Sequence, residues 1–482
     1  MIFFILGAAF ALRTYRTADF LGFWYDQGRD ALVIWDLWHK GKFFLIGPTT
    51  GIEGIFLGPF YYYLIAPFYL LGRGNPIFPA VWLVIINLAG IYLAYHIGTR
   101  FFSRTAGFFA AVFLAFSWSI SFSHRWLSNP TPLPFFALLT ILSLLHVING
   151  RRRWWWLLGL AAGLSLHLEA ASATFFLPSI LVVLLWRRKH LKASPRDFLI
   201  SFSFFGLTLL PQIVFDFRHG HLLFNAFRKF LIADSSFQPR LTELLTGRLR
   251  FYFDIFTNKF FLSREISRLF VVILTVLAFS ARRRLPKIPT LTLLVWWLVP
   301  VISLLFYHGN NGYVWDYYFT GVFPVMVILV ASVLASAFSA GTLSRLTVIA
   351  IIGIFLYHNS WQLGLALTRP HPGSVTLSSS LAAVDWVYQD TAGLPFNTDV
   401  YVPPVIPYAY DYLFLWRGMT RYRHQPLSAL TTRLYTLYEP DGQHPQFLDA
   451  WLARQATIGS VEETVRFNSI TVSRRHRFKL SD

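Results

Sequence analysis

Long apolar runs recur along most of the chain, and no other feature constrains its fold as strongly. A helix that crosses the hydrocarbon core of a bilayer, roughly 30 Å thick, needs about 20 mostly apolar residues. Hydrophobic residues make up 55% of the 482-residue sequence, and its mean hydropathy is +0.50, well above that of a soluble globular domain. The sequence therefore predicts an α-helical polytopic membrane protein.

Eleven windows are apolar enough to be interpreted as transmembrane spans. They lie near residues 1–15, 77–98, 104–122, 131–149, 154–168, 171–186, 198–216, 266–281, 290–307, 319–338 and 345–361. A further apolar segment, 57–72, is short and aromatic, and Pro59 and Pro67 interrupt it. The distribution of basic residues decides whether this segment crosses.

Short basic clusters between the apolar runs carry the net charge of +19. They include RRR at 151–153, RRKHLK at 187–192 and RRRLPK at 282–287. Cytoplasmic loops carry an excess of Lys and Arg, and all clusters fall on that face only if segment 57–72 does not cross. We therefore expect 57–72 to be an interfacial or re-entrant segment on the outer side. Membrane lipids are the expected partner of the clusters, and no nucleic acid is expected.

This topology fixes where chemistry should be sought. The outer face holds residues 16–76, 123–130, 167–170, 217–265 and 308–318. The expected location is the plasma (inner) membrane, with many passes and the active site on the extracytoplasmic side. The chain has no Cys, which excludes disulfides, thiolate metal sites and Cys nucleophiles.

The composition changes after Trp361, where the Pro- and Ser-rich run TRPHPGSVTLSSS follows and no later window could span a membrane. We divide the chain into a transmembrane domain at 1–361, a linker at 362–379 and an extracytoplasmic domain at 380–482. The last part is predicted to be a small α/β domain. Its strand-like segments are 399–404, 433–440 and 470–475, and its helix-like segments are 380–389 and 445–454.

Carboxylates are concentrated in the first outer loop, in the stretch FWYDQGRDALVIWDLWHKGK. Asp26, Asp30 and Asp36 alternate with apolar residues at helical spacing, which predicts an amphipathic helix in the outer interface. A solvated polar face is the plain alternative for Asp30 and Asp36. Asp26 differs because three aromatic residues precede it at the exit of the first span. A carboxylate at the membrane boundary is costly, and it indicates a functional site.

The order of these features resembles the GT-C superfamily of polyprenyl-phosphate-dependent glycosyltransferases, which includes protein O-mannosyltransferases and lipid A aminoarabinose transferases. The shared order is a first span, an acidic opening of the first outer loop, two juxtamembrane helices, many further spans and an outer C-terminal domain. The resemblance covers roughly residues 1–361. It implies a GT-C fold with about eleven transmembrane helices.

The resemblance also implies roles for single residues. The catalytic aspartate of the superfamily falls on Asp26, and the second acid of that pair is here Gln27. The second outer loop usually carries an acid before Pro, and here SHRWLSNP has Asn129, which can still donate a hydrogen bond. Glu53 occupies the position of a metal-binding Glu in the aminoarabinose transferases.

Glycosyl transfer from a lipid phosphate needs a base at the acceptor and positive charge or hydrogen-bond donors at the departing phosphate. Asp26 meets the first need for an inverting displacement. Arg makes bidentate contacts with phosphate. The candidate donor-phosphate and substrate-binding residues are Gln27, Arg29, Arg125, Asn129, Arg218, His219 and Tyr317. The alternative for each His is an interfacial polar residue satisfied by a neighbour, and for Tyr317 an ordinary anchor of the aromatic belt.

His167 and Glu169 lie between two apolar runs, where an unpaired polar group is expensive. With Glu53 they are the candidate ligands of a divalent metal ion, although a set from distant loops cannot be established from sequence. No Gly-rich phosphate loop follows a strand, so no nucleotide cofactor is expected. The long outer loop 217–265 is basic and aromatic, and an amphipathic helix is predicted at 241–257.

The predicted function is transfer of a single sugar from a polyprenyl-phosphate-linked donor to a glycan, lipid or protein acceptor on the extracytoplasmic face. One alternative is a transporter or flippase of lipid-linked saccharides, which predicts buried charges within spans and paired broken helices. Another is a cell-surface glycan polymerase or ligase, which shares the donor class. A non-catalytic scaffold would leave Asp26 replaceable.

Overall fold

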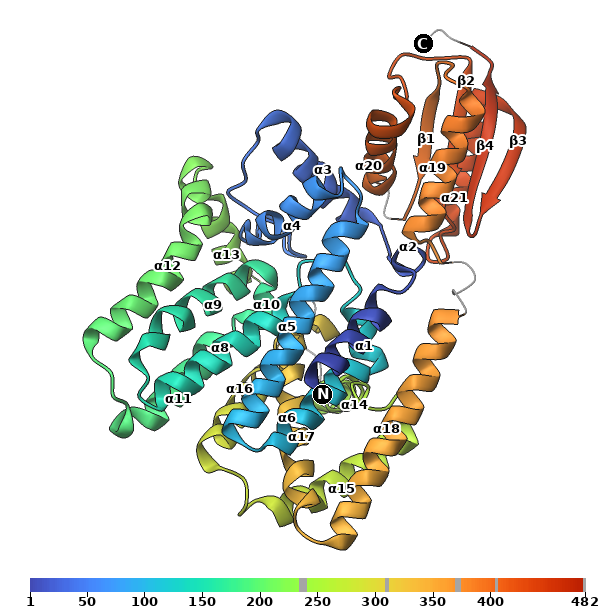
Figure 1. Ribbon diagram of the computed structural model, residues 1–482. Helices are drawn as coiled ribbons and strands as arrows, with labels where there is room; N and C mark the ends of the chain where they lie inside the picture. The colour runs from blue at the N-terminus through green and yellow to red at the C-terminus, as the bar shows by residue number, and fades with distance from the viewer. Residues whose placement is uncertain (234–240, 308–311, 369–373, 404–405, 480–482) are drawn as a thin grey trace.

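Helices dominate the structure, a computed structural model that describes residues 1–233, 241–307, 312–368, 374–403 and 406–479. Every predicted span contains an α-helix, which confirms the predicted helical fold class. These helices are α1 (Ile2–Thr14), α5 (Ile77–Phe101), α6 (Arg104–Phe116), α8 (Leu133–Ile148), α9 (Trp155–Leu168), α11 (Phe176–Arg187), α12 (Pro195–Arg218), α15 (Arg264–Ala281), α16 (Lys287–Leu305), α17 (Phe323–Phe338) and α18 (Thr342–Thr368). Figure 1 shows them as one extended bundle.

Length and burial distinguish these helices. Within the described residues, five helical segments are long and apolar enough to cross a membrane: Ile77–Phe101, Ala170–His190, Pro195–Arg218, Lys287–Leu305 and Thr342–Thr368. The shorter α17 lies in the core, since every residue from Phe323 to Ser332 is buried. In contrast, α12 leaves large apolar side chains such as Phe202 exposed. An exposed apolar face of this kind suits contact with lipid.

Two helices, α3 (Tyr25–Lys40) and α4 (Phe60–Leu71), separate α1 from α5. α3 buries its apolar face and ends at Gly41, whose positive φ of 65° closes the helix in the left-handed conformation. α4 has 12 residues, which is about 18 Å of helix and too short to cross a bilayer core. The length of α4 fits the expectation that segment 57–72 does not span.

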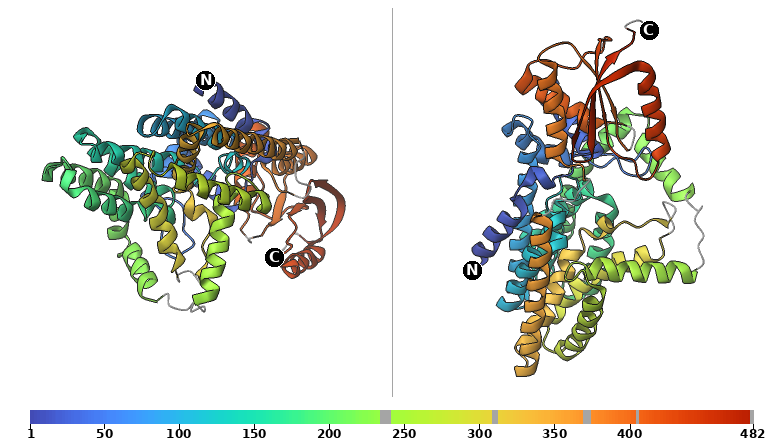
Figure 2. Two further views of the ribbon diagram at one scale, coloured as in Figure 1. Left: turned by 90° about the horizontal axis from the view of Figure 1, so that it is seen from below. Right: turned by 90° about the vertical axis from the view of Figure 1, so that its right-hand side faces the viewer.

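The loop 217–265 contributes α13 (Leu222–Ala233) and α14 (Leu241–Thr257), and α14 confirms the helix predicted at 241–257. α14 lies across the direction of the long helices (Figure 2, right). Shorter helices connect the others: α2 (Thr17–Phe20), α7 (Trp118–Ser123), η1 (Arg152–Trp154), α10 (Ala170–Ala173), η2 (Arg188–His190), η4 (Asp316–Phe319) and η5 (Gly418–Tyr422).

The C-terminal part contains a four-stranded sheet in the order β1-β2-β4-β3, in which β1 and β2 are parallel and the other pairs are antiparallel. Its elements are α19 (Leu377–Thr391), β1 (Asn397–Tyr401), α20 (Tyr408–Arg417), β2 (Arg433–Tyr438), α21 (Pro445–Ile458), β3 (Gly459–Phe467) and β4 (Ile470–Arg477). The predicted strands and helices are present, while α20 and β3 were not predicted. Part of the predicted linker, 369–373, lies outside the described residues, and the proposed domain boundaries stay a prediction.

The sheet lies beyond one end of the helical bundle, and α20 packs on α3 (Figures 1 and 2). The contact is so close that a Cβ on Gly28 would lie 2.3 Å from the backbone nitrogen of Ala409. The Tyr412 hydroxyl donates to the Gly74 carbonyl oxygen, and Trp416 Nε1 donates to the Arg73 carbonyl oxygen at 2.8 Å. α3 is therefore clamped between the bundle and the C-terminal part.

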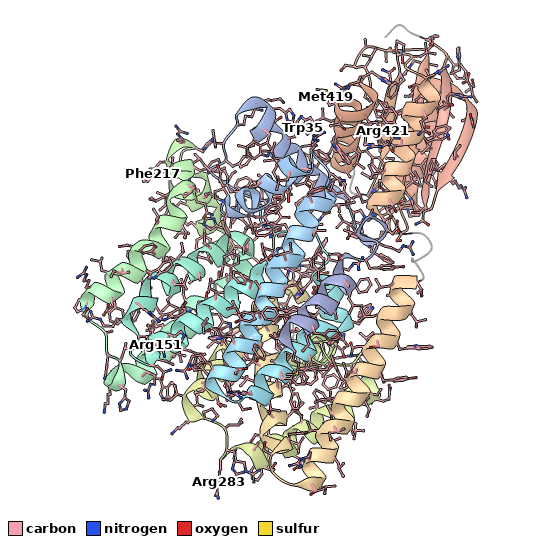
Figure 3. All side chains as sticks on the ribbon, viewed as in Figure 1. Trp35, Arg151, Phe217, Arg283, Met419 and Arg421 are labelled. Carbon is pink, nitrogen blue, oxygen red and sulfur yellow. The ribbon has the colours of Figure 1, made fainter. Side chains whose placement is uncertain are left out.

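Figure 3 labels residues near the two ends of the molecule. Trp35 on α3 and Met419 lie near the junction with the sheet, and Arg151 and Arg283 lie toward the opposite end. The predicted topology requires this arrangement, since it assigns Arg151 and Arg283 to the cytoplasmic face.

Candidate functional site

Asp26 lies in the first turn of α3 and shares an arginine with Asp30. Arg29 Nη1 contacts Asp26 Oδ1 at 2.9 Å, and Arg29 Nη2 contacts Asp30 Oδ1 at 2.8 Å. The Asp26 side chain is 58% exposed, whereas that of Asp30 is buried. Asp26 therefore remains accessible to a substrate, while Arg29 is fixed by its second carboxylate and by Thr49 Oγ1 at 2.8 Å.

Asp30 holds Arg29 in place and is itself held by a residue of α4. The Tyr62 hydroxyl on α4 donates to Asp30 Oδ1 at 3.0 Å. Burial raises the pKa of Asp30 to about 6, although Arg29 acts in the opposite direction. The alternative of a solvated face is thus wrong for Asp30, because α4 covers it. It holds better for Asp36, which pairs with Lys40 and Lys42, each at 2.7 Å.

The two amides of the predicted site make structural hydrogen bonds. Gln27 is buried, accepts from the Trp24 backbone N–H at 3.1 Å and donates to the Leu127 carbonyl oxygen at 3.0 Å. Asn129 Nδ2 donates to the Leu168 carbonyl oxygen at 2.6 Å. Gln27 consequently ties the start of α3 to the second outer loop, next to Asp26.

Arg125 is used in the same structural way. It is buried, and its guanidinium donates to the carbonyl oxygens of Leu12 at 2.8 Å and Tyr15 at 2.6 Å. These carbonyls belong to the last turn of α1 and the residue after it, which intrahelical bonds leave unsatisfied. Arg125 thus caps α1, and its described hydrogen bonds go to the backbone.

Arg218 and His219 lie at the end of α12. Arg218 is exposed, and the His219 ring stacks on Phe215 with centroids 4.0 Å apart. The Nδ1 atom of His219 lies 2.8 Å from the carbonyl oxygen of Phe215. The described contacts of His219 therefore stay within its own helix.

The candidate metal ligands do not form one set. His167 is buried against Gly58, and its Nδ1 accepts from the Phe60 N–H at 3.4 Å. Glu169 Oε1 accepts from the Ala171 N–H at 3.1 Å, and burial raises the Glu169 pKa to about 7. Glu53 is exposed. Among the residues that the structure describes, no three His, Asp or Glu side chains could hold a metal ion, so no chemical step is derived through one.

A cavity of about 140 Å³ opens beside the second outer loop. Three segments far apart in sequence form it: residues 123–134, the end of α14 with Lys259, and residues 316–323. Tyr317, a predicted substrate residue, is part of its wall. The other polar lining residues are Ser123, His124, Thr131, Lys259, Asp316 and Thr320, and the apolar ones are Trp126, Pro130, Pro134, Ile255, Phe256, Phe319 and Phe323.

Lys259 and Tyr62 had no part in the site expected from sequence. Lys259 follows a helix in a loop rich in basic residues, and Tyr62 is one of three successive tyrosines, so local sequence does not single out either. Only the packing of α4 on α3, and of the loop after α14 on residues 316–323, gives them their positions.

The structure has helices of transmembrane length, the two helices α3 and α4 between α1 and α5, and an accessible carboxylate at the start of α3. Residues 57–214 match the family described as dolichyl-phosphate-mannose-protein mannosyltransferase. No curated protein matches the chain by sequence.

Solved structures share the fold over nearly the whole chain. ArnT from Cupriavidus metallidurans in the apo state has a TM-score of 0.63 and 13% identity, covering 98% of this chain and 97% of ArnT. ArnT bound to undecaprenyl phosphate matches with the same TM-score and coverage, at 14% identity. The Archaeoglobus fulgidus oligosaccharyltransferase in complex with Zn and sulfate has a TM-score of 0.51 and 14% identity, covering 81% of this chain and 55% of that protein. The predicted resemblance to the GT-C superfamily is confirmed in the fold.

Proposed function

We propose that this chain is a membrane glycosyltransferase that moves a single sugar from a polyprenyl-phosphate-linked donor to an acceptor on the extracytoplasmic face. The observation that carries the proposal is an accessible carboxylate, Asp26, at the start of α3 in a fold shared with ArnT over 98% of the chain. Two further findings support it: a solved ArnT contains undecaprenyl phosphate, and residues 57–214 match a mannosyltransferase family.

In this proposal Asp26 is the catalytic base. The acceptor hydroxyl oxygen attacks C1 of the donor sugar, the bond between C1 and the phosphate oxygen breaks, and the lipid phosphate leaves with the electron pair. The acceptor proton passes to the Asp26 carboxylate and then to water. A single displacement at C1 inverts the configuration of the sugar. Arg29 positions Asp26, and Asp30 with Tyr62 holds Arg29 in place.

The transporter alternative predicts buried charges within spans, and Arg13 in α1 is such a charge. Its guanidinium donates to the carbonyl oxygens of Leu114 at 2.8 Å and Ala115 at 2.9 Å, and to His124 Nδ1 at 3.3 Å. These partners satisfy Arg13 at the end of α6. This hydrogen bonding assigns Arg13 a role in helix packing and gives no support to transport.

The test is sugar transfer in membranes that contain the chain, supplied in turn with radiolabelled polyprenyl-phosphate sugars. Membranes from the same cells without the chain are the control. Label in a glycan, lipid or protein product that appears only with the chain supports the proposal, and the product names the acceptor. If donor crosses the membrane without any product, the transporter is the correct class.

A further inference from the structure

The cavity beside the second outer loop is lined by two side chains that have N–H groups beyond those their described partners use. His124 and Lys259 both line it, and they come from segments 135 residues apart in sequence. Each has a partner that fixes its orientation. The kind of ligand that the cavity can bind therefore depends on the N–H groups that do not bond to these partners.

His124 is buried and makes a directed hydrogen bond with one ring nitrogen. Its Nδ1 lies 3.3 Å from Arg13 Nε, and since Arg can only donate, Nδ1 accepts. Burial and the charge of Arg13 lower the pKa of His124 well below its usual value, so the ring is neutral. The proton of a neutral ring that accepts at Nδ1 sits on Nε2. Among the described residues, Nε2 has no hydrogen-bond partner.

Lys259 supplies a positive charge. Its Nζ donates to Ser119 Oγ at 3.2 Å and lies 5.3 Å from the ring centroid of Phe323. An ammonium group has three protons, and the Ser119 contact uses one. Asp316, also in the wall, is exposed and raises the Lys259 pKa, while burial lowers it more. A ligand oxygen with a negative charge would offset that cost of burial.

The rest of the wall restricts the ligand further. Most of it is apolar, and Phe256, Phe319 and Phe323 lie next to the polar groups. The volume of about 140 Å³ is similar to the roughly 150 Å³ of an engineered cavity that binds benzene. It accommodates the end of a lipid and excludes a complete donor. An oxyanion joined to a short apolar segment fits both the charge and the lining.

We propose that this cavity binds the phosphate-ester end of an isoprenoid lipid, with Lys259 as the charged contact and His124 Nε2–H as the neutral donor. The inference rests on the proposed function, because it assigns the lipid phosphate of that reaction to residues. Arg13 acts through His124, so it is a positioning residue for the ligand.

The test is equilibrium binding of radiolabelled farnesyl phosphate to the purified full-length protein in detergent. Farnesol, which lacks the phosphate, and inorganic phosphate are the comparison ligands. Wild type is expected to bind farnesyl phosphate at least about tenfold more tightly than farnesol, because a charge-assisted hydrogen bond contributes that much. Lys259→Gln should lose this preference, and Lys259→Arg should keep most of it.

Lys229→Gln is the matched control, because Lys229 is exposed on α13 and the substitution removes the same charge. It should bind like wild type. The inference is overturned if Lys259→Gln and wild type bind equally. It is also overturned if phosphatidic acid displaces farnesyl phosphate as well as unlabelled farnesyl phosphate does, since the site would then be a general anionic-lipid surface.

The two proposals fail separately. Phosphate-dependent binding without any sugar transfer would overturn the proposed function and leave this site intact. Sugar transfer that Lys259→Gln leaves unchanged, together with unchanged binding, would overturn this site and leave the function intact.

Discussion

Asp30 is a buried carboxylate whose raised pKa makes protein stability depend on pH. Its pKa of about 6 lies above the usual value of 3.8, so the folded protein holds a proton that the unfolded chain has already released. The contribution of Asp30 to the unfolding free energy therefore falls as pH rises from about 4 to about 6, and it stays low above that range.

Asp30→Asn should remove this dependence. The unfolding temperature of the variant, relative to wild type, should be higher at about pH 7 than at about pH 5. The measurement is thermal unfolding of the purified proteins in detergent at both pH values. Asp36→Asn is the control, because hydrogen bonds from Lys40 and Lys42 lower the pKa of Asp36 below its usual value of 3.8, so its difference from wild type should be the same at both pH values. An unchanged difference for Asp30→Asn would contradict the assigned burial.

For single residues, the sequence alone could place Asp26 and Asp30 on one helical face, because they are four residues apart. It could not tell which of them is buried. That depends on Tyr62, which reaches Asp30 from a helix that begins 30 residues after Asp30, at Phe60. Lys259 was missed for the same reason, since it meets His124 and Tyr317 in one cavity only in the fold.

The packing of α20 on α3 makes Gly28 a sensitive position at the scale of the elements. A Cβ there would lie 2.3 Å from the Ala409 nitrogen, and backbone atoms would have to move. Gly28→Ala should destabilise the protein by about 1–3 kcal/mol, the usual cost of overpacking. Because α3 carries Asp26, sugar transfer should fall as well. Thermal unfolding and transfer assays at matched expression check both effects.

Gly364→Ala on α18 is the matched control. Nothing lies within 4 Å of a Cβ at that position, so the extra methyl group meets open space. Its unfolding temperature should not fall below that of wild type, since Ala favours a helix more than Gly does. If Gly28→Ala were as stable and active as this control, α20 would not hold α3 in place.

Elements with strong apolar periodicity were predictable, and the ones missed have mixed signals. β3 is an edge strand whose residues are mostly exposed, so its sequence GSVEETVRF lacks an apolar face. α20 has the sequence YAYDYLFLWR, and its aromatic residues are ones that are enriched in strands. The packing of α20 on α3 makes this segment a helix.

The whole molecule has two chemically distinct ends, and their orientation in the membrane can be tested directly. The chain has no Cys, so a single introduced Cys is the only labelling site. Met419 and Arg283 are exposed and lie toward opposite ends of the molecule (Figure 3). An impermeant maleimide added outside intact cells should label Met419→Cys and leave Arg283→Cys unlabelled until the cells are opened. The reverse pattern would place Asp26 in the cytoplasm and contradict the proposed topology.

The central claim is that Asp26 performs the chemistry, and one measurement tests it most directly. It is the rate of sugar transfer by Asp26→Asn compared with Asp36→Asn, at matched expression and with the donor that wild type accepts. Both variants remove one carboxylate from α3, but only Asp26 contacts Arg29. A positioned general base contributes about 10²–10⁴-fold, so Asp26→Asn should be slower by at least about a hundredfold and Asp36→Asn close to wild type. Equal rates for Asp26→Asn and wild type would contradict the account.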